Sequence, residues 1–295
     1  MKLVLRASLA AALAAVGLCQ NASAEIIYAV ANQGIATNLI SFDSSSPSNL
    51  LSGTNITGLQ ANETLVAIDF RPATGQLYGL GSSSRLYTIN TGTGAATGVG
   101  GQFSTLLNGF SFGFDFNPNI DRIRVVSEVN QNLVLNPITG AVQLVATNLA
   151  YVAADPNFGI DPNVVDSAYT NNVPNAASTQ LYGIDTGRDI LVTQANNAGT
   201  LGTVGLLGID ASAAGGFDIS GTSGIAYAAL LTSGSSQSSL YTINLATGLA
   251  VPLGVIDGGI VVSAMTVAPA IPEPATLGLV ATSLLGLAAM RRRSS

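Results

Sequence analysis

Short hydrophobic runs and polar turn residues alternate along most of this 295-residue chain. Between residues 26 and 267, runs rich in Val, Ile, Leu, Tyr and Phe are separated about every eight to twelve residues by clusters of Gly, Asn, Asp, Ser and Thr. The long 3.6-residue periodicity of amphipathic helices is missing from this region. The pattern therefore predicts an all-β protein built from many short strands.

The predicted strands recur in groups of four. The clearest groups span residues 65–100 and 111–146, and in both a Thr-Gly turn precedes the last strand. Looser copies span residues 150–207 and 216–254. Repetition of one four-stranded unit is typical of architectures that stack the same unit around or along an axis.

A fifth group is divided between the two ends of the repeat region. Residues 26–59 supply three strands, and residues 261–267 supply one that resembles the first strand of every other group. One C-terminal strand joined to three N-terminal strands is how β-propellers close their ring. We therefore expect a five-bladed β-propeller closed by a C-terminal strand in the N-terminal blade. A β-sandwich or jelly roll, with the repeat marking stacked hairpins, is the alternative.

The two ends of the chain have a different character from the repeat region. Residues 1–24 show a basic start, an apolar stretch and small residues before Glu25, which is the layout of a cleavable secretory signal. The tail at 271–295 reads Ile-Pro-Glu-Pro, then an uncharged apolar run, then three arginines. We therefore divide the chain into a signal peptide, an ectodomain at 25–270 and a tail.

The apolar run of the tail, residues 275–290, predicts a short transmembrane helix. As a helix it would span about 24 Å, which is short of a bilayer core of about 30 Å. Arginines directly after the run would keep the C-terminus on the cytoplasmic side, so the ectodomain would lie across the membrane. The residues assigned to the motif are Pro272, Glu273, Pro274, Arg291, Arg292 and Arg293.

This order of features resembles the PEP-CTERM sorting signal of Gram-negative bacteria. The resemblance implies a protein that the secretion translocase exports, that is anchored transiently in the inner membrane, and that an exosortase then processes. It also implies a final location at the cell surface or outside the cell. A simple C-terminal membrane anchor without enzymatic processing is the alternative.

The composition of residues 25–270 excludes several kinds of chemistry. Cys, His, Trp and Lys are missing, and the only cations are five arginines. The usual zinc, copper and haem ligands are therefore lacking, and neither a Ser-His-Asp nor a Cys-His nucleophile can form. Fifteen Asp and Glu outweigh the arginines, which argues against nucleic acid as a partner. We expect a protein that is not an enzyme.

Acidic residues recur at matching places in the repeats. Asp69, Asp115, Asp155 and Asp218 lie near the ends of predicted innermost strands, and Thr266 takes the corresponding place in the closing strand. An Asp before a Pro, Gly or Asn turn can accept backbone N–H bonds and fix the exit of the strand. We expect this structural role for the recurrent acids.

Two of these aspartates open segments with oxygen-bearing side chains at nearly every second position. Such spacing can direct several oxygens at one hard cation such as calcium, but the second segment has Ile160 where an EF-hand needs Gly. Calcium binding and Asx turns both remain open, so no cofactor is firmly predicted. The candidates are Asp115, Asn117, Asn119 and Asp121 in the first segment and Asp155, Asn157, Asp161 and Asn163 in the second.

Arginine and tyrosine side chains give weaker signals. Arg122 and Arg124 should face the same side of one strand, where they could bind an acidic ligand or, as we expect, pair with Asp115 and Asp121. The recurrent tyrosines could stack on carbohydrate, but tyrosines at fixed strand positions more often pack between blades. These tyrosines are Tyr28, Tyr78, Tyr87, Tyr182, Tyr227 and Tyr241.

Four segments of the ectodomain resemble a bacterial family catalogued as domain of unknown function 4394. They read FGFDFNP at 112–118, DRIRVVS at 121–127, AYTNN at 168–172 and LYGID at 181–185. The resemblance covers most of residues 26–268. It implies membership of a family that often accompanies PEP-CTERM tails, and it transfers no catalytic residue.

Three functional classes are compatible with these features. The first is a non-enzymatic protein of the cell surface or extracellular matrix, a scaffold that binds polysaccharide or another surface protein. The second is a calcium-dependent hydrolase or lactonase that works through carboxylates of the propeller channel. The third is an envelope sensor or assembly partner. Fold alone does not choose among them, because propellers serve both binding and catalysis.

Overall fold

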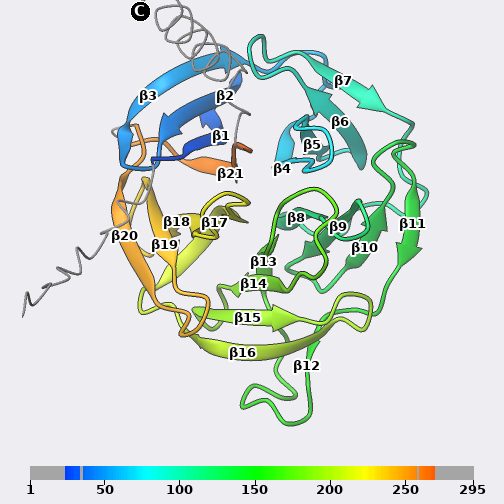
Figure 1. Ribbon diagram of the computed structural model, residues 1–295, viewed down its shortest axis with the longest axis vertical. Helices are drawn as coiled ribbons and strands as arrows, with labels where there is room; N and C mark the ends of the chain where they lie inside the picture. The colour runs from blue at the N-terminus through cyan, green and yellow to red at the C-terminus, as the bar shows by residue number, and fades with distance from the viewer. Residues whose placement is uncertain (1–23, 34–35, 258, 270–295) are drawn as a thin grey trace, which may run out of the picture.

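A computed structural model describes residues 24–33, 36–257 and 259–269. All of its regular elements are β-strands, which form five small sheets around a central axis (Figure 1). Among these residues, no helix has the length and apolar character needed to cross a membrane. The predicted signal peptide (except Ala24), the helix at 275–290 and the six residues of the sorting motif lie outside the described ranges.

Each sheet is one blade of the propeller, with its first strand innermost and its last strand on the rim. Blade 1 consists of β21 (Val262–Val267), β1 (Ile26–Gln33), β2 (Ala36–Asp43) and β3 (Ser46–Asn55). Blade 2 consists of β4 (Leu65–Phe70), β5 (Leu77–Gly81), β6 (Arg85–Ile89) and β7 (Ala96–Val99). Blade 3 consists of β8 (Phe112–Asn117), β9 (Arg122–Ser127), β10 (Asn132–Leu135) and β11 (Val142–Val145).

The last two blades complete the ring. Blade 4 consists of β13 (Val164–Tyr169), β14 (Leu181–Asp185), β15 (Ile190–Gln194) and β16 (Thr200–Leu206), with the short strand β12 (Ala150–Tyr151) added outside β16. Blade 5 consists of β17 (Ala211–Ile219), β18 (Ala226–Thr232), β19 (Ser238–Ile243) and β20 (Ala250–Val255).

Blade 1 closes the ring by pairing the two ends of the ectodomain. Strand β21 runs antiparallel to β1, with Ile27 opposite Val267 and Ala29 opposite Met265. The backbone N–H of Ala268 donates to the carbonyl of Ile26 at 2.8 Å. The predicted five-bladed propeller with a split N-terminal blade is therefore confirmed, and the sandwich or jelly-roll alternative is wrong.

The Thr-Gly repeat marks the turn before the outermost strand of a blade. In blade 3, the side-chain oxygen of Asn136 accepts the N–H groups of Ile138 and Thr139 at 2.8 and 3.2 Å, and Gly140 follows with φ +68°. The equivalent turns of blades 2 and 5 have the same bonds. A Cβ at Gly140 would lie 1.9 Å from the carbonyl oxygen of Val99 in blade 2. Glycine therefore lets the rims of neighbouring blades touch through their backbones.

The hydrophobic core fills the spaces between adjacent blades. Tyr78 of blade 2 and Phe116 of blade 3 meet edge to face, with ring centroids 5.2 Å apart. The hydroxyl of Tyr78 donates to the carbonyl of Pro137 across the same boundary at 3.3 Å. Of the six tyrosines predicted to pack between blades, four are buried, which favours packing over carbohydrate stacking: Tyr78, Tyr87, Tyr227 and Tyr241.

The start of blade 4 departs from the prediction. The sequence places its innermost strand just after Ala150, but β12 at that point pairs in parallel with β16 on the outer edge. The innermost strand is β13. Asp155 therefore lies in the connection that leads from the rim to the channel and not on an innermost strand, so its predicted place beside the other recurrent acids is wrong.

Candidate functional site

The innermost strands place five equivalent residues around the central channel. Their equivalence follows from register, because each is paired with the same position of the second strand of its own blade: Tyr78, Arg124, Tyr182, Tyr227 or Tyr28. We call them the ring positions. In the order of blades 2, 3, 4, 5 and 1 they are Asp69, Asp115, Ala168, Asp218 and Thr266.

Side chains at the ring positions bind the backbone of the next blade. The carboxylate of Asp69 accepts the N–H of Phe116 at 2.8 Å, and that of Asp218 accepts the N–H of Val267 at 2.7 Å. Thr266 makes the equivalent contact more loosely. Both aspartates therefore accept backbone N–H groups, as predicted. The two bonds named join neighbouring blades, and Asp218 adds a local one from the N–H of Ile219 at 2.6 Å.

Three ring carboxylates converge in the channel. Asp69, Asp115 and Asp218 are 1%, 1% and 2% exposed, and each offers one oxygen that lies within 4.8 Å of those of the other two. The hydroxyl of Thr266 lies 2.9 Å from Asp69 Oδ1 and 2.9 Å from Asp218 Oδ2. We call these four residues the channel cluster. It is the only such convergence of acidic side chains among the described residues.

Asp115 differs from the other members of the channel cluster because neither of its carboxylate oxygens has a hydrogen-bond partner. By analogy with its neighbours it should accept the N–H of Tyr169. That N–H lies close enough to lower the pKa of Asp115, but it makes no hydrogen bond to either carboxylate oxygen. An unpaired carboxylate buried to this degree is costly, and it needs a compensating proton or cation.

Burial and mutual repulsion favour the neutral form of the cluster. Loss of hydration raises the pKa of Asp69 well above its ordinary value, and the charge of Asp218 raises it further. Burial also raises the pKa of Asp115 well above normal, with added repulsion from Asp69 and Asp218. The pKa of Asp218 is raised by burial too, although N–H and hydroxyl donors oppose the shift.

A hollow of about 320 Å³ lies at the end of the channel where the innermost strands begin. Asp166 and Val165 of blade 4 line it together with Phe112 and Val262 from other blades. Burial raises the pKa of Asp166 well above its ordinary value, and its Oδ2 has no hydrogen-bond partner. Asp166 precedes the ring position of its strand by two residues and is not part of the channel cluster.

The first predicted calcium segment does not gather its oxygens at one point. Asp115 faces the channel, whereas the side-chain oxygen of Asn117 accepts the N–H of Asn119 at 3.0 Å. The side chain of Asn119 donates to the carbonyl of Ala176 in blade 4 at 2.7 Å. Asp121 pairs with an arginine of blade 2. Only Asp115 of this segment belongs to the channel cluster.

The second predicted calcium segment also spreads its side chains. Asp155 accepts the N–H of Asn157 at 2.8 Å and the N–H of Thr203 at 2.6 Å, which is an Asx turn tied to β16. Asp161 instead accepts a bond from the side chain of Asn130 at 2.7 Å. Asn163 uses its backbone carbonyl to accept the N–H of Thr186. The geometry of both segments favours the structural alternative.

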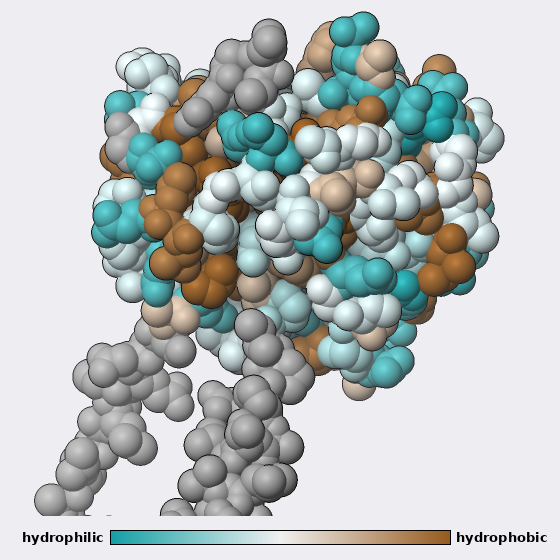
Figure 2. Space-filling model, turned by 90° about the horizontal axis from the view of Figure 1, so that it is seen from above, coloured by the Kyte–Doolittle hydropathy of each residue, from teal (hydrophilic) through white to brown (hydrophobic). Residues whose placement is uncertain are grey.

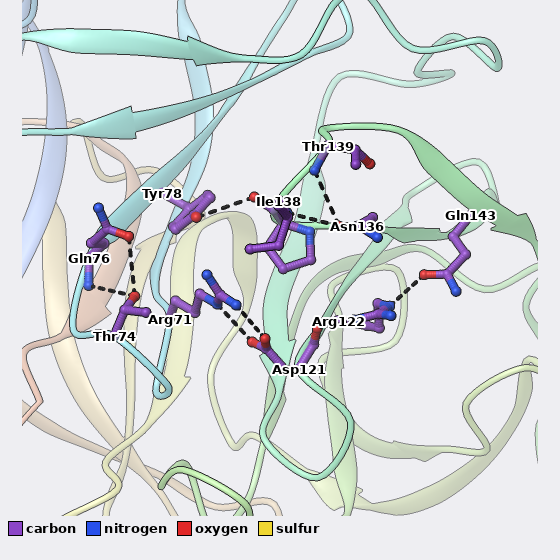
Figure 3. Close-up of polar contacts among 11 residues, drawn as sticks. Arg71, Thr74, Gln76, Tyr78, Asp121, Arg122, Asn136, Ile138, Thr139 and Gln143 are labelled. Atoms are coloured by element: carbon purple, nitrogen blue, oxygen red, sulfur yellow. Dashed lines mark hydrogen bonds and ion pairs between the residues drawn. The ribbon is translucent and has the colours of Figure 1, made fainter.

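One ion pair joins blades 2 and 3. The guanidinium of Arg71 binds the carboxylate of Asp121 through two nitrogens (Figure 3), with Nε at 2.8 Å from Oδ1. This contact raises the pKa of Arg71. It was not anticipated from the sequence, because the two residues are far apart in the chain and belong to different repeats.

The predicted pairing of Arg122 and Arg124 with the nearby aspartates is wrong. Arg122 donates to the side chain of Gln143 and to the backbone carbonyl of Asp121 (Figure 3). Arg124 is buried and donates to the side-chain oxygens of Asn132 and Asn197 at 2.7 and 2.8 Å. Its positive charge is therefore bound at the boundary of blades 3 and 4 and forms no ion pair with the channel cluster.

Two family models match this chain. A family model described as a domain of unknown function (DUF4394) matches residues 38–266, which is most of the chain. The chain belongs to the DUF4394 family. A second model, the PEP-CTERM protein-sorting motif, matches residues 270–293, which indicates an exported, exosortase-processed protein located at the cell surface or outside the cell. A comparison with curated proteins finds no significant match.

Solved structures resemble this DUF4394 member at low identity. A structural genomics protein of unknown function from Bacteroides thetaiotaomicron is 12% identical, with a TM-score of 0.50 over 78% of this chain and 57% of that one. Hydrazine synthase of Kuenenia stuttgartiensis is 15% identical, with a TM-score of 0.40 over 68% and 51%. Glutaminyl cyclase of Myxococcus xanthus is 12% identical, with a TM-score of 0.45 over 73% and 87%. The chain thus spans 57% of the Bacteroides protein and 51% of hydrazine synthase, and the likeness to the Bacteroides protein concerns the fold alone.

Proposed function

We propose that this DUF4394 protein is a non-enzymatic scaffold of the cell surface or extracellular matrix, which binds polysaccharide or another surface protein after exosortase processing. The burial of the acidic side chains carries this proposal. A carboxylate that acts as acid, base or nucleophile must reach its substrate, whereas the three of the channel cluster are at most 2% exposed. The calcium-dependent hydrolase considered from the sequence would need these groups to be open.

The rim of the propeller supports a binding role. The outermost strands of blades 1 and 5 lie side by side, and just beyond the end of β20 the N–H of Asp257 donates to the carbonyl of Pro47 in β3 at 3.1 Å. Both strands expose large apolar side chains, and hydrophobic atoms gather on the left of the face seen in Figure 2. Contiguous apolar surface of this kind is typical of interaction sites. We call these exposed residues the rim patch: Leu50 and Leu51 of β3 and Val251, Leu253 and Val255 of β20.

Delivery to the surface is tested in cells that carry the full chain. Replacement of Pro272, Glu273 and Pro274 by alanine should prevent exosortase processing, so the protein should stay in the inner membrane with its C-terminal mass intact. The control is Thr282→Ala in the same tail, which should be processed like the natural chain. Unchanged location and mass in the triple variant would contradict the proposal.

Binding is tested by co-sedimentation of the full chain with the polysaccharide and envelope fraction of the producing cells. The natural chain should sediment with this material, and the double variant Leu51→Ser, Leu253→Ser should remain in solution. The control is Asp161→Asn, at an exposed residue distant from the rim patch, and this variant should sediment like the natural chain. Sedimentation that is equal for the double variant and the natural chain would exclude the rim patch as the binding surface.

A further inference from the structure

We propose that Asp69, Asp115, Asp218 and Thr266 bind one calcium ion in the central channel of the propeller. This site differs from both loop segments that the sequence suggested. The proposal does not depend on the scaffold function, because an ion inside the ring would support any use of the outer surface.

The first argument is the charge of the channel cluster. Three carboxylates lie within 4.8 Å of one another and are almost fully buried, and like charges at this spacing cannot all ionise without a counter-charge. Arg124 lies opposite Asp115 in the strand register, but its guanidinium is bound to Asn132 and Asn197. Among the described residues no ion pair reaches the cluster, so its neutralisation must come from protons or from a bound cation.

The second argument is the shortage of hydrogen-bond donors. Thr266 has a single hydroxyl proton, yet its oxygen lies 2.9 Å from two carboxylates. Asp69 receives one backbone N–H and Asp218 receives two, while Asp115 is 1% exposed and has no partner on either oxygen. A cation accepts lone pairs from all of these oxygens at once and needs no donor. The unpaired carboxylate of Asp115, which faces the other two, is the observation that points to a ligand.

The third argument is the kind of ion that fits. Carboxylate and hydroxyl oxygens are hard ligands, and Ca²⁺ binds them at about 2.3–2.6 Å. Two oxygens on opposite sides of such an ion lie about 4.6–5.2 Å apart, so three oxygens that all lie within 4.8 Å of one another can share one ion. Mg²⁺ has shorter bonds and usually keeps several waters. Ala168 takes the fifth ring position and adds neither ligand nor bulk.

The test measures bound metal and thermal stability of the full-length chain purified in detergent. After dialysis against calcium and removal of free ion, the natural chain should hold one calcium per molecule. A chelator should lower its thermal midpoint, and calcium at about a hundred times its Kd should raise it again by about 5–10 °C. Magnesium at the same concentration should restore less than half of this shift.

Variants locate the ion. Asp115→Asn keeps the shape of the side chain and removes its charge, so it should hold less than about a tenth of a calcium ion and lose the thermal shift. Asp166→Asn in the same channel and Asp161→Asn in the second loop segment are matched controls and should bind calcium like the natural chain.

Two outcomes would overturn the assignment. The first is a natural chain that holds no calcium and whose midpoint is the same in calcium and in chelator, and this result requires no variant to fold. The second is retention of calcium by Asp115→Asn at the level of the natural chain. Neither outcome bears on sorting or on rim binding, so failure of the ion site is separable from failure of the proposed function.

Discussion

The carboxylate of Asp69 accepts the backbone N–H of Phe116 at 2.8 Å, and this bond joins the innermost strands of blades 2 and 3. Asp218 binds Val267 in the same way between blades 5 and 1. Residues that face the channel therefore hold the ring together. Aspartate suits these positions because its short side chain can accept an N–H from the innermost strand of the neighbouring blade.

The hydroxyl of Thr266 should matter most for these contacts, because it lies between two buried carboxylates. Thr266→Val keeps the shape and removes the only side-chain donor in the cluster, so we expect a loss of about 1–3 kcal/mol in the free energy of unfolding. Denaturant unfolding measures the loss. Thr97→Val, on the exposed face of β7, should change stability by less than about 0.5 kcal/mol, and equal effects of both variants would contradict this role.

Stability in chelator should fall as the pH rises. The pKa values of Asp69, Asp115 and Asp218 are raised in the folded state by burial, and Glu25 adds repulsion at Asp218. The folded state therefore binds more protons than the unfolded state above about pH 4, so the stabilisation is complete below that pH and is lost as the pH rises through the raised pKa values.

Thermal midpoints between pH 4 and 8 test this dependence. Asp115→Asn removes one titrating group and should flatten the fall, and saturating calcium should abolish it in the natural chain. Asp155, whose pKa is lowered by bonds to Thr203 and Asn157, contributes in the opposite direction, so the difference between Asp115→Asn and the natural chain is the decisive quantity. Identical pH profiles for the two proteins would contradict the predicted titration.

Glycine at the rim turn should be required for blade packing. A Cβ at Gly140 would meet the carbonyl oxygen of Val99 at 1.9 Å, and its φ of +68° disfavours other residues. Gly140→Ala should therefore destabilise the protein by about 2–4 kcal/mol, as seen by chemical denaturation. Gly101→Ala is the control, since nothing lies within 4 Å of the added carbon. A cost below about 1 kcal/mol at Gly140 would show that the rims can separate freely.

The ion pair between blades 2 and 3 should depend on the planar guanidinium. Arg71→Lys keeps the charge but cannot bind Asp121 through two nitrogens, so we expect a loss of about 1 kcal/mol, because the carboxylate side chain is 35% exposed and partly screened. High salt should reduce the difference between this variant and the natural chain. Arg85→Lys, which alters no ion pair of the described residues, should leave stability unchanged.

Much of the fold was predictable because most blades repeat the same order of short strands and the same turn residues. Asn136 and Gly140 fix a turn by their own chemistry, so such turns can be recognised without a structure. The closing strand was predictable because residues 261–267 resemble the first strand of the other groups and would otherwise have no partner. The innermost strand of blade 4 could not be located from the sequence, because its ring position is Ala168 and not an acidic residue. Asp155, which precedes this strand, resembles the ring aspartates of the other blades in its sequence context.

The state of the channel cluster was not predictable from the sequence. Asp69 and Asp115 look alike in their repeats, yet one accepts a backbone N–H and the other has no partner. That difference arises between neighbouring blades, because Asp69 of blade 2 bonds to Phe116 of blade 3, whereas Asp115 of blade 3 makes no such bond to blade 4. In the same way, Arg124 is adjacent to Asp115 in the strand register but is held by asparagines of two blades.

The place where β21 ends has a mechanical consequence. The sorting motif begins at residue 270, and β21 ends at Val267 opposite Ile27. Strand β21 is an edge of its sheet and has β1 as its only paired neighbour. Tension applied to the chain after residue 269 would therefore act directly on the strand that closes the ring. Under a pulling force, the pairing between β21 and β1 would break before the other four blades were stretched.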